Sequence, residues 1–132
     1  MPELSAASST GLDPRTASAL AYLAGPFSGA LVLWAETANR DVRFHAWQSI
    51  LGLGGLFLAV ALSGVLAVLS LFVSATMMLA MVRIATLLAI VFAMVWILCL
   101  WKAFGGGRWK LPFVGDLAER RAITLPGPDA RN

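Results

Sequence analysis

The residues best suited to chemistry lie together at the start of a long apolar run. If this stretch forms a helix, four polar side chains fall on one face, namely Asp41, His45, Gln48 and Ser49. A carboxylate four residues before a histidine can fix the ring tautomer and raise its pKa, as in a proton relay or an oriented ligand. Alternatively, the same groups cap neighbouring helix ends and loop carbonyls. Porphyrin or chlorophyll ligation by His45 is a more remote alternative.

Other catalytic and cofactor signatures are missing from the sequence. His45 is the only histidine and Cys99 the only cysteine, so the chain by itself offers no metal site of the usual kind and no disulfide. No glycine loop precedes a Lys-Ser or Lys-Thr pair, and no partner residue identifies a serine nucleophile. We therefore expect a protein that is not an enzyme and has no cofactor or metal ion.

The composition indicates a membrane protein. Hydrophobic residues make up 59% of the chain and charged residues only 13%, whereas soluble domains have about half and a quarter. Uncharged runs extend over residues 16–35, 46–82 and 84–101. A helix of about 20 residues crosses the bilayer core, so these runs predict an all-α bundle of three transmembrane helices.

The first predicted helix begins at Asp13-Pro14 and continues to about Ala35. Gly25-Pro26 falls in its middle, where proline removes a backbone hydrogen bond, so we expect a kink or break there. A re-entrant or interfacial segment is the alternative. A polar connection, Glu36 to Asp41, follows it.

The second and third predicted helices cover about residues 42–73 and 77–104, with Ser74-Ala75-Thr76 as the turn between them. Residues 14–122 then form one transmembrane domain, between disordered tails at 1–13 and 123–132. Within this domain, residues 111–121 alternate apolar and charged positions, which predicts a short segment lying in the membrane interface.

Basic residues predict the orientation of the chain. With three spans, the connection and the C-terminal tail share one side, which carries eight basic residues: Arg40, Arg43, Lys102, Arg108, Lys110, Arg120, Arg121 and Arg131. Arg15 and Arg83 are on the other side. The side chain of Arg83 is close enough to the membrane surface to reach the head groups, or else it is functional within the membrane. The positive-inside rule places the N-terminus outside and the C-terminus in the cytoplasm. Anionic lipid head groups, rather than nucleic acid, explain the net charge of +3.

Small residues recur at every fourth position in the apolar segments. Such rows let helices approach closely in lipid, either within the bundle or between molecules. The predicted packing positions are Gly25, Gly29, Gly55, Ala59, Ser63, Ala85 and Ala89.

Several strings in the sequence resemble a known family. They are Leu-Ala-Tyr-Leu-Ala-Gly-Pro at 20–26, Asn-Arg-Asp-Val-Arg-Phe-His-Ala-Trp-Gln-Ser at 39–49, Trp-Lys-Ala-Phe at 101–104 and Gly-Arg-Trp-Lys-Leu-Pro-Phe-Val-Gly-Asp-Leu-Ala-Glu at 107–119. The chain resembles small bacterial membrane proteins related to the twenty-kilodalton component of the chloroplast inner-envelope import machinery. This resemblance implies a bacterial inner-membrane protein and a link to a protein-conducting complex, but brings no catalytic residues.

The matched strings and the basic tail supply candidate residues at the cytoplasmic interface: Arg40, Arg43, His45, Gln48, Trp109, Lys110, Pro112, Gly115 and Asp116. We expect Arg40 and Arg43 to clamp lipid phosphate or the acidic Glu36 and Asp41, with Arg43 able to stack on Trp47.

Two functions remain open. The protein is either an accessory or assembly subunit of a larger membrane complex, or a component of a translocation or transport pathway. A conduit requires His45 and Gln48 to face a cavity between subunits, whereas a docking subunit buries them.

Overall fold

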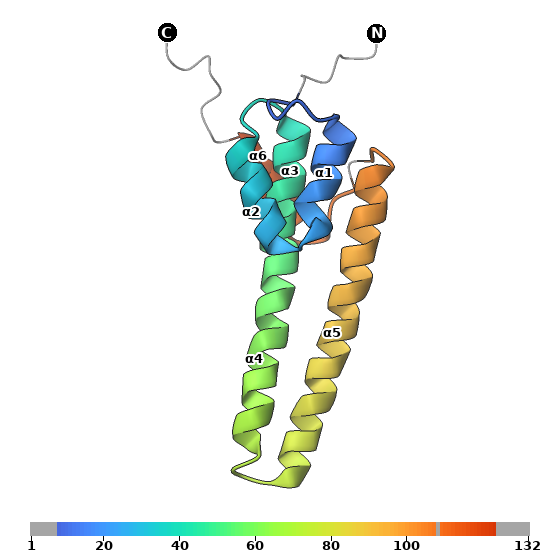
Figure 1. The fold of residues 1–132 in the computed structure, drawn as a ribbon. Helices are drawn as coiled ribbons and strands as arrows, with labels where there is room; N and C mark the ends of the chain where they lie inside the picture. Colours follow the sequence, from blue (N-terminus) through green and yellow to red (C-terminus); the bar gives the residue numbers. More distant parts are fainter. Residues whose placement is uncertain (1–7, 108, 124–132) are drawn as a thin grey trace.

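The computed structural model describes residues 8–107 and 109–123, and every regular element in these ranges is helical (Figure 1). In chain order the elements are α1 (Pro14–Leu23), α2 (Pro26–Ala35), α3 (Arg40–Gln48), the π-helical turn η1 (Ser49–Leu53), α4 (Gly54–Ser70), α5 (Ala75–Phe104) and α6 (Gly115–Ile123).

Two long helices dominate the fold. The segments α3, η1 and α4 form one continuous helix, Arg40–Ser70, of 31 residues, and α5 has 30. At 1.5 Å per residue each is about 45 Å long, enough to cross a bilayer core of about 30 Å. The turn between them ends at Ser74, whose Oγ accepts a hydrogen bond from Met77 N at 3.1 Å. The second and third predicted helices are confirmed as candidate spans by length and composition.

The first apolar segment is broken at Gly25-Pro26, as expected, but a helix that spans the membrane is not confirmed there. Helices α1 and α2 have ten residues each, about 15 Å, half the thickness of a bilayer core. Gly25 has φ 62°, a conformation that suits glycine, and Pro26 opens α2, where its missing N–H costs nothing. The chain reverses there, so α1 and α2 form a hairpin (Figure 1), a shape compatible with a re-entrant or an interfacial segment.

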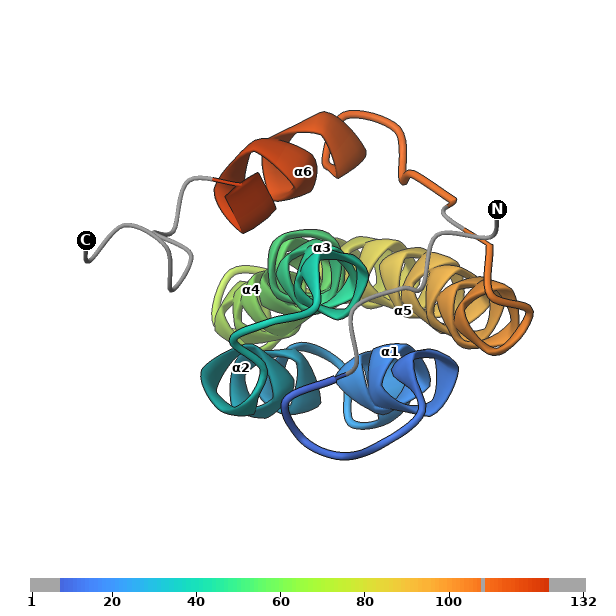
Figure 2. The same cartoon turned by 90° about the horizontal axis from the view of Figure 1, so that it is seen from above.

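The hairpin lies against one side of α3 and α6 against another (Figure 2), while the C-terminal half of α5 packs on α1. One cluster of buried residues joins α1, η1 and α5, namely Ala19, Tyr22, Leu53, Cys99 and Ala103. A second, smaller cluster joins Phe44 of α3 to Ala118 and Ala122 of α6. We call α1, α2, α3, α6 and the end of α5 the body. The rest, α4 with the first half of α5, extends beyond it as the long hairpin (Figure 1).

The start of α1, the start of α3 and the end of α5 lie at the same end of the molecule. Pro14, Asp41 and Gly106 line one cavity there. The prediction that the N-terminal side lies opposite the C-terminal side is therefore wrong for the described chain, because the first segment turns back. All described basic residues except Arg83 lie in the body or in the chain between α5 and α6 that packs on it, whereas Arg83 lies in the first third of α5.

Part of the predicted N-terminal tail is placed by contacts. Ser8 and Ser9 donate hydrogen bonds to the carboxylate of Glu36. Residues 1–7 and 124–132 of the two predicted tails lie outside the described residues.

The predicted packing rows behave differently on the two long helices. In α4, Ser63 is buried and Ala59 half-buried, whereas Gly55 is exposed with open space around it. In α5, Ala85 is half-buried but Ala89 faces outward. The inward face of α5 instead carries mostly larger side chains, spaced three and four apart: Met78, Met81, Ala85, Leu88, Phe92, Val95 and Cys99.

Candidate functional site

The polar strip of α3 meets the α1–α2 hairpin at Tyr22. The Tyr22 hydroxyl lies 3.1 Å from His45 Nδ1 and accepts a hydrogen bond from Gln48 Nε2 at 3.2 Å. The rings of Tyr22 and His45 also meet edge to face, with centroids 5.7 Å apart. All three side chains are buried. The predicted strip is therefore an internal contact surface of the body.

Gln48 connects this contact to the chain that follows α5. Its Nε2 donates to the carbonyl oxygen of Trp109 at 3.1 Å, and its Oε1 accepts from the N–H of Leu111 at 3.2 Å. Gly52 makes room for this connection, because a Cβ there would lie 2.8 Å from Leu111 Cδ1. One amide, only 1% exposed, thus holds three segments together.

The reversal of the hairpin leaves carbonyl groups that lipid cannot satisfy, and side chains from other elements bond them. Ser49 Oγ donates to the carbonyl of Gly25 at 2.9 Å, and Trp96 Nε1 donates to that of Tyr22 at 2.6 Å. Ser28 Oγ lies 3.2 Å from the carbonyl of Ala21. Ser49, the last residue of the predicted polar strip, therefore bonds a carbonyl at the hairpin reversal, as in the capping alternative to a proton relay.

Two predicted glycines shape this contact. Gly25 makes the reversal, and Gly29 lets α2 approach α3 closely, since a Cβ at position 29 would lie 3.0 Å from both the Ala46 carbonyl oxygen and Ser49 Oγ.

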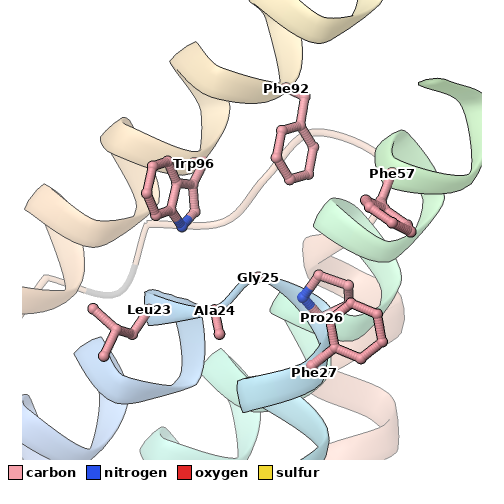
Figure 3. Close-up of a pocket in the computed structure, with 8 residues that line it drawn as sticks. All are labelled: Leu23, Ala24, Gly25, Pro26, Phe27, Phe57, Phe92 and Trp96. Atoms are coloured by element: carbon pink, nitrogen blue, oxygen red, sulfur yellow. The ribbon is translucent and has the colours of Figure 1, made fainter. Parts of the chain in front are cut away.

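An apolar hollow of about 220 Å³ lies at the tip of the hairpin (Figure 3). Its walls are Leu23, Ala24, Gly25, Pro26, Phe27, Phe57, Phe92 and Trp96. The aromatic side chains of Phe57 and Phe92 come from the two long helices and face the hairpin tip. The hollow suits a hydrocarbon group and provides no set of polar groups for catalysis.

A polar cavity of about 220 Å³ opens at the basic end of the body. Its lining residues are Pro14, Arg15, Ser18, Asp41, His45, Ala103 and Gly106. Arg15 packs closely over Gly106, where a Cβ would lie 2.8 Å from its Nε. The cavity brings Asp41 and His45 together, as the spacing predicted, and its mixed charges suit water or a small polar molecule.

Glu36 organises a second buried polar cluster that the sequence pattern did not reveal. Its carboxylate accepts hydrogen bonds from the Ser8 and Ser9 side chains and from the backbone N–H groups of Ser9, Ala38 and Asn39. Burial alone would raise the pKa of this carboxyl, but these donors outweigh it and hold the pKa at about 2. Asn39 in turn caps α3 by accepting from the N–H groups of Asp41 and Val42.

Of the predicted interface residues after α5, Lys110, Pro112 and Asp116 are exposed, Trp109 is half-buried and Gly115 is buried. Lys110 Nζ lies 2.6 Å from Glu119 Oε2 and 3.5 Å from Asp116 Oδ1, and Glu119 raises the pKa of the lysine. Pro112 is exposed, and Gly115 begins α6 against the backbone of Lys110. These exposed pairs position α6 and contribute little to stability.

The expected contact of Arg40 and Arg43 with lipid phosphate stays a prediction, whereas the expected stacking of Arg43 on Trp47 is not seen. Arg40 is exposed at the start of α3, whereas Arg43 is only 8% exposed. Within the described residues, Arg43 forms no ion pair with an acidic side chain, and its Nε and Nη2 lack hydrogen-bond partners. The cation above the Trp47 ring is Arg121 of α6, at 5.9 Å.

The residues that sequence reasoning missed are Tyr22, Glu36 and Trp96. Tyr22 is the only tyrosine of the chain and stands within an apolar segment, which was the available signal. Nothing in the local sequence predicted the hydrogen bonds that Trp96 and Glu36 form with segments far away in the chain. Among the described residues, no group of three or more His, Cys, Asp or Glu side chains could hold a metal ion.

These features define a small helical membrane protein in which a short α1–α2 hairpin is tied to a long helical hairpin through buried polar groups. The chain belongs to the UPF0132 membrane protein family. A UPF0132 membrane protein of Methanocaldococcus jannaschii is 37% identical over 113 residues, covering 85% of this chain and 91% of the relative. One of Archaeoglobus fulgidus is 34% identical over 116 residues, covering 83% and 96%. No protein-family model and no solved structure matches the chain.

The relatives support part of the resemblance noted above. They are membrane proteins, as expected, but they come from archaea, and their names state no activity. They give no support to a bacterial origin or to a relation with the chloroplast import component.

Proposed function

We propose that this protein is a non-enzymatic accessory subunit that docks onto another membrane protein through its long hairpin. The observation that carries the proposal is the contrast in burial. The side chains of His45 and Gln48 are only 6% and 1% exposed inside the body. In the apolar stretch of α5, by contrast, only 6% of the residues are buried. The polar groups are therefore used to hold the fold together, and the surface left for a partner is that of the long hairpin.

The outward face of α5 fits close contact with another helix. Ala89 and Ala93 are both exposed and four residues apart, so they leave a shallow strip on which a second helix could approach. Gly55 of α4 is also exposed, and a Cβ added at this position would meet nothing within 4 Å. In lipid, close packing replaces the hydrophobic effect as the force between helices.

A translocation role similar to that of the chloroplast component needs a polar path through the membrane. Within the long hairpin, the hydroxyls of Ser63, Ser70 and Thr86 each donate to a carbonyl of their own helix. They offer no continuous polar path in one molecule. This favours docking over conduction.

The basic end also supports an orientation. The positive-inside rule favours a cytoplasmic location for the end that holds Arg15, Arg40 and Lys102. In this arrangement the ends of α1 and α5 nearest the two termini both lie on the cytoplasmic side, and the α4–α5 turn lies outside.

The docking proposal is tested with a photo-crosslinking amino acid at Ile97, an exposed position of α5 four residues after Ala93 and on the same face. We expect a crosslink to a different membrane protein in native membranes, lost in an Ala89→Leu/Ala93→Leu variant that still folds. Leu87→Phe, at a position 63% exposed on another face of α5, is the control and should leave the crosslink intact. Crosslinks to lipid alone, or only to a second copy of the chain, would contradict the proposal.

A further inference from the structure

The strongest unexplained feature of the molecule is the side chain of Arg43. The residue is only 8% exposed, and its Nε and Nη2 have no hydrogen-bond partner among the described residues. A buried, charged donor without an acceptor destabilises the fold, because it loses its hydrogen bonds to water without replacing them. An acceptor from outside the described chain is therefore the simplest account of this site.

The two unpartnered atoms also specify the shape of that acceptor. Nε–H and one N–H of Nη2 point in the same direction along one edge of the planar guanidinium group. This edge donates two parallel hydrogen bonds to a pair of oxygen atoms on a carboxylate or phosphate. A single carbonyl oxygen or a water molecule would satisfy it less well.

Neighbouring groups add donors and positive charge. Trp47 lies one turn after Arg43 on α3, and its Nε1 is likewise buried without a partner in the described chain. Arg121 of α6 lies 5.9 Å above the Trp47 ring. Arg40, three residues before Arg43, adds an exposed positive charge on the same side of the helix.

Acidic side chains near this part of the body are engaged elsewhere. Glu36 accepts from Ser8 and Ser9, and Glu119 pairs with Lys110. Asp41 lines the polar cavity together with His45. Within the described ranges, the site thus collects donors and cations without a carboxylate of its own.

We propose that Arg43, Trp47 and Arg121 bind a phosphate-type oxyanion, with the Nε and Nη2 edge of Arg43 as its principal contact. A membrane provides such groups as lipid phosphates. Leu117 and Ile123 of α6 are exposed apolar residues, as in a helix that lies in the head-group region, where these phosphates are found. Because the guanidinium is covered, entry of the anion requires side chains to move aside. This inference is independent of the docking role proposed for the long hairpin.

The test uses the full chain, ¹⁵N-labelled, in a neutral detergent, and follows the indole N–H resonance of Trp47 by NMR. The probes are dioctanoyl phosphatidylglycerol, inorganic phosphate and dioctanoylglycerol, which has the same chains without a phosphate. We expect the phospholipid to shift the Trp47 signal saturably and dioctanoylglycerol to leave it unchanged. Tighter binding of the phospholipid than of inorganic phosphate identifies a lipid head group as the ligand, and the reverse identifies free phosphate. Both results support the site, and no shift with either probe overturns it.

Substitutions separate a bidentate site from general attraction to positive charge. Arg43→Gln and Arg43→Lys should both weaken binding at least about tenfold, since lysine keeps the charge but lacks the paired donors. Arg40→Gln, the matched control on the same helix, should change it less than about threefold, because an exposed charge contributes little. Equal weakening by Arg40→Gln, or normal binding by Arg43→Lys, would overturn the proposal. The indole signals of Trp96 and Trp109 report whether each variant is folded. If the Arg43 variants do not fold, Trp47→Phe allows the same titration to be read from the Arg43 Nε–H signal.

Discussion

The body and the long hairpin are both rich in apolar residues, but different interactions hold each of them together. In the body, Gln48, Ser49 and Trp96 donate hydrogen bonds to carbonyls of other segments. In the long hairpin, the hydroxyls of Ser63 and Ser70 bond only within their own helix. Where a helix is broken inside a membrane, distant side chains must satisfy its backbone, whereas unbroken helices need only pack.

The largest expected effect comes from Gln48→Ala. This change removes the hydrogen bonds to Tyr22, Trp109 and Leu111 and leaves a cavity, so we expect a loss of about 4 kcal/mol in unfolding free energy. Reversible unfolding in mixed detergent and denaturant measures it. Gln48→Glu, which keeps the size and the acceptor, is the control and should lose less. A loss below about 1 kcal/mol would show that the body does not depend on this amide.

Acidification should destabilise the body through Glu36. Its pKa falls from 4.5 in the unfolded chain to about 2 in the folded one, so the stabilisation is complete above pH 4.5 and is lost as the pH falls toward 2. The difference corresponds to about 3 kcal/mol. Unfolding free energy measured between about pH 6 and pH 2 checks this, and Glu36→Gln should remove most of the dependence. A Glu36→Gln variant with an unchanged pH profile would contradict it.

Adding one methyl group should have opposite effects in the two regions. Gly29→Ala places a Cβ 3.0 Å from the backbone oxygen of Ala46, and we expect a loss of about 1–2 kcal/mol from overpacking. Gly55→Ala meets nothing within 4 Å and should stabilise α4 by about 0.5–1 kcal/mol, because alanine favours a helix. Thermal unfolding of the two variants measures whether their stability changes in opposite directions. Equal effects would mean that α2 and α3 are less closely packed than described.

The smallest expected contrast is between two serines of the continuous helix. Ser49→Ala removes the bond to the Gly25 carbonyl and should cost about 1 kcal/mol. Ser63→Ala removes a bond to Val60 of its own helix and should change stability by less than about 0.5 kcal/mol. Chemical denaturation of both variants under one condition gives the comparison. A larger loss at Ser63 would show that the long hairpin also depends on polar groups.

The sequence predicted the long helices well, because their length and lack of charge leave few alternatives. It located the break at Gly25-Pro26 but not the reversal, since the same two residues can bend a helix or end it. The reversal depends on Ser49 and Trp96, which lie 24 and 74 residues from their partners in sequence. A local pattern cannot show such pairings.

The polar strip on α3 was predictable from helical spacing, and its partner Tyr22 was not. The small-residue row of α5 did not reveal that Ala89 faces outward, because a spacing of four identifies a row without saying which way it faces. Larger side chains such as Leu88 and Phe92 occupy the inward side instead.

The α1–α2 hairpin also has a consequence for the order in which the protein assembles. It is made early, since α1 and α2 precede both long helices in the chain. Yet the carbonyl of Tyr22 accepts a hydrogen bond from Trp96 Nε1, and Gln48 forms hydrogen bonds with the backbone of Trp109 and Leu111. The α1–α2 hairpin therefore cannot complete its hydrogen bonds until α5 has been synthesised and has entered the membrane.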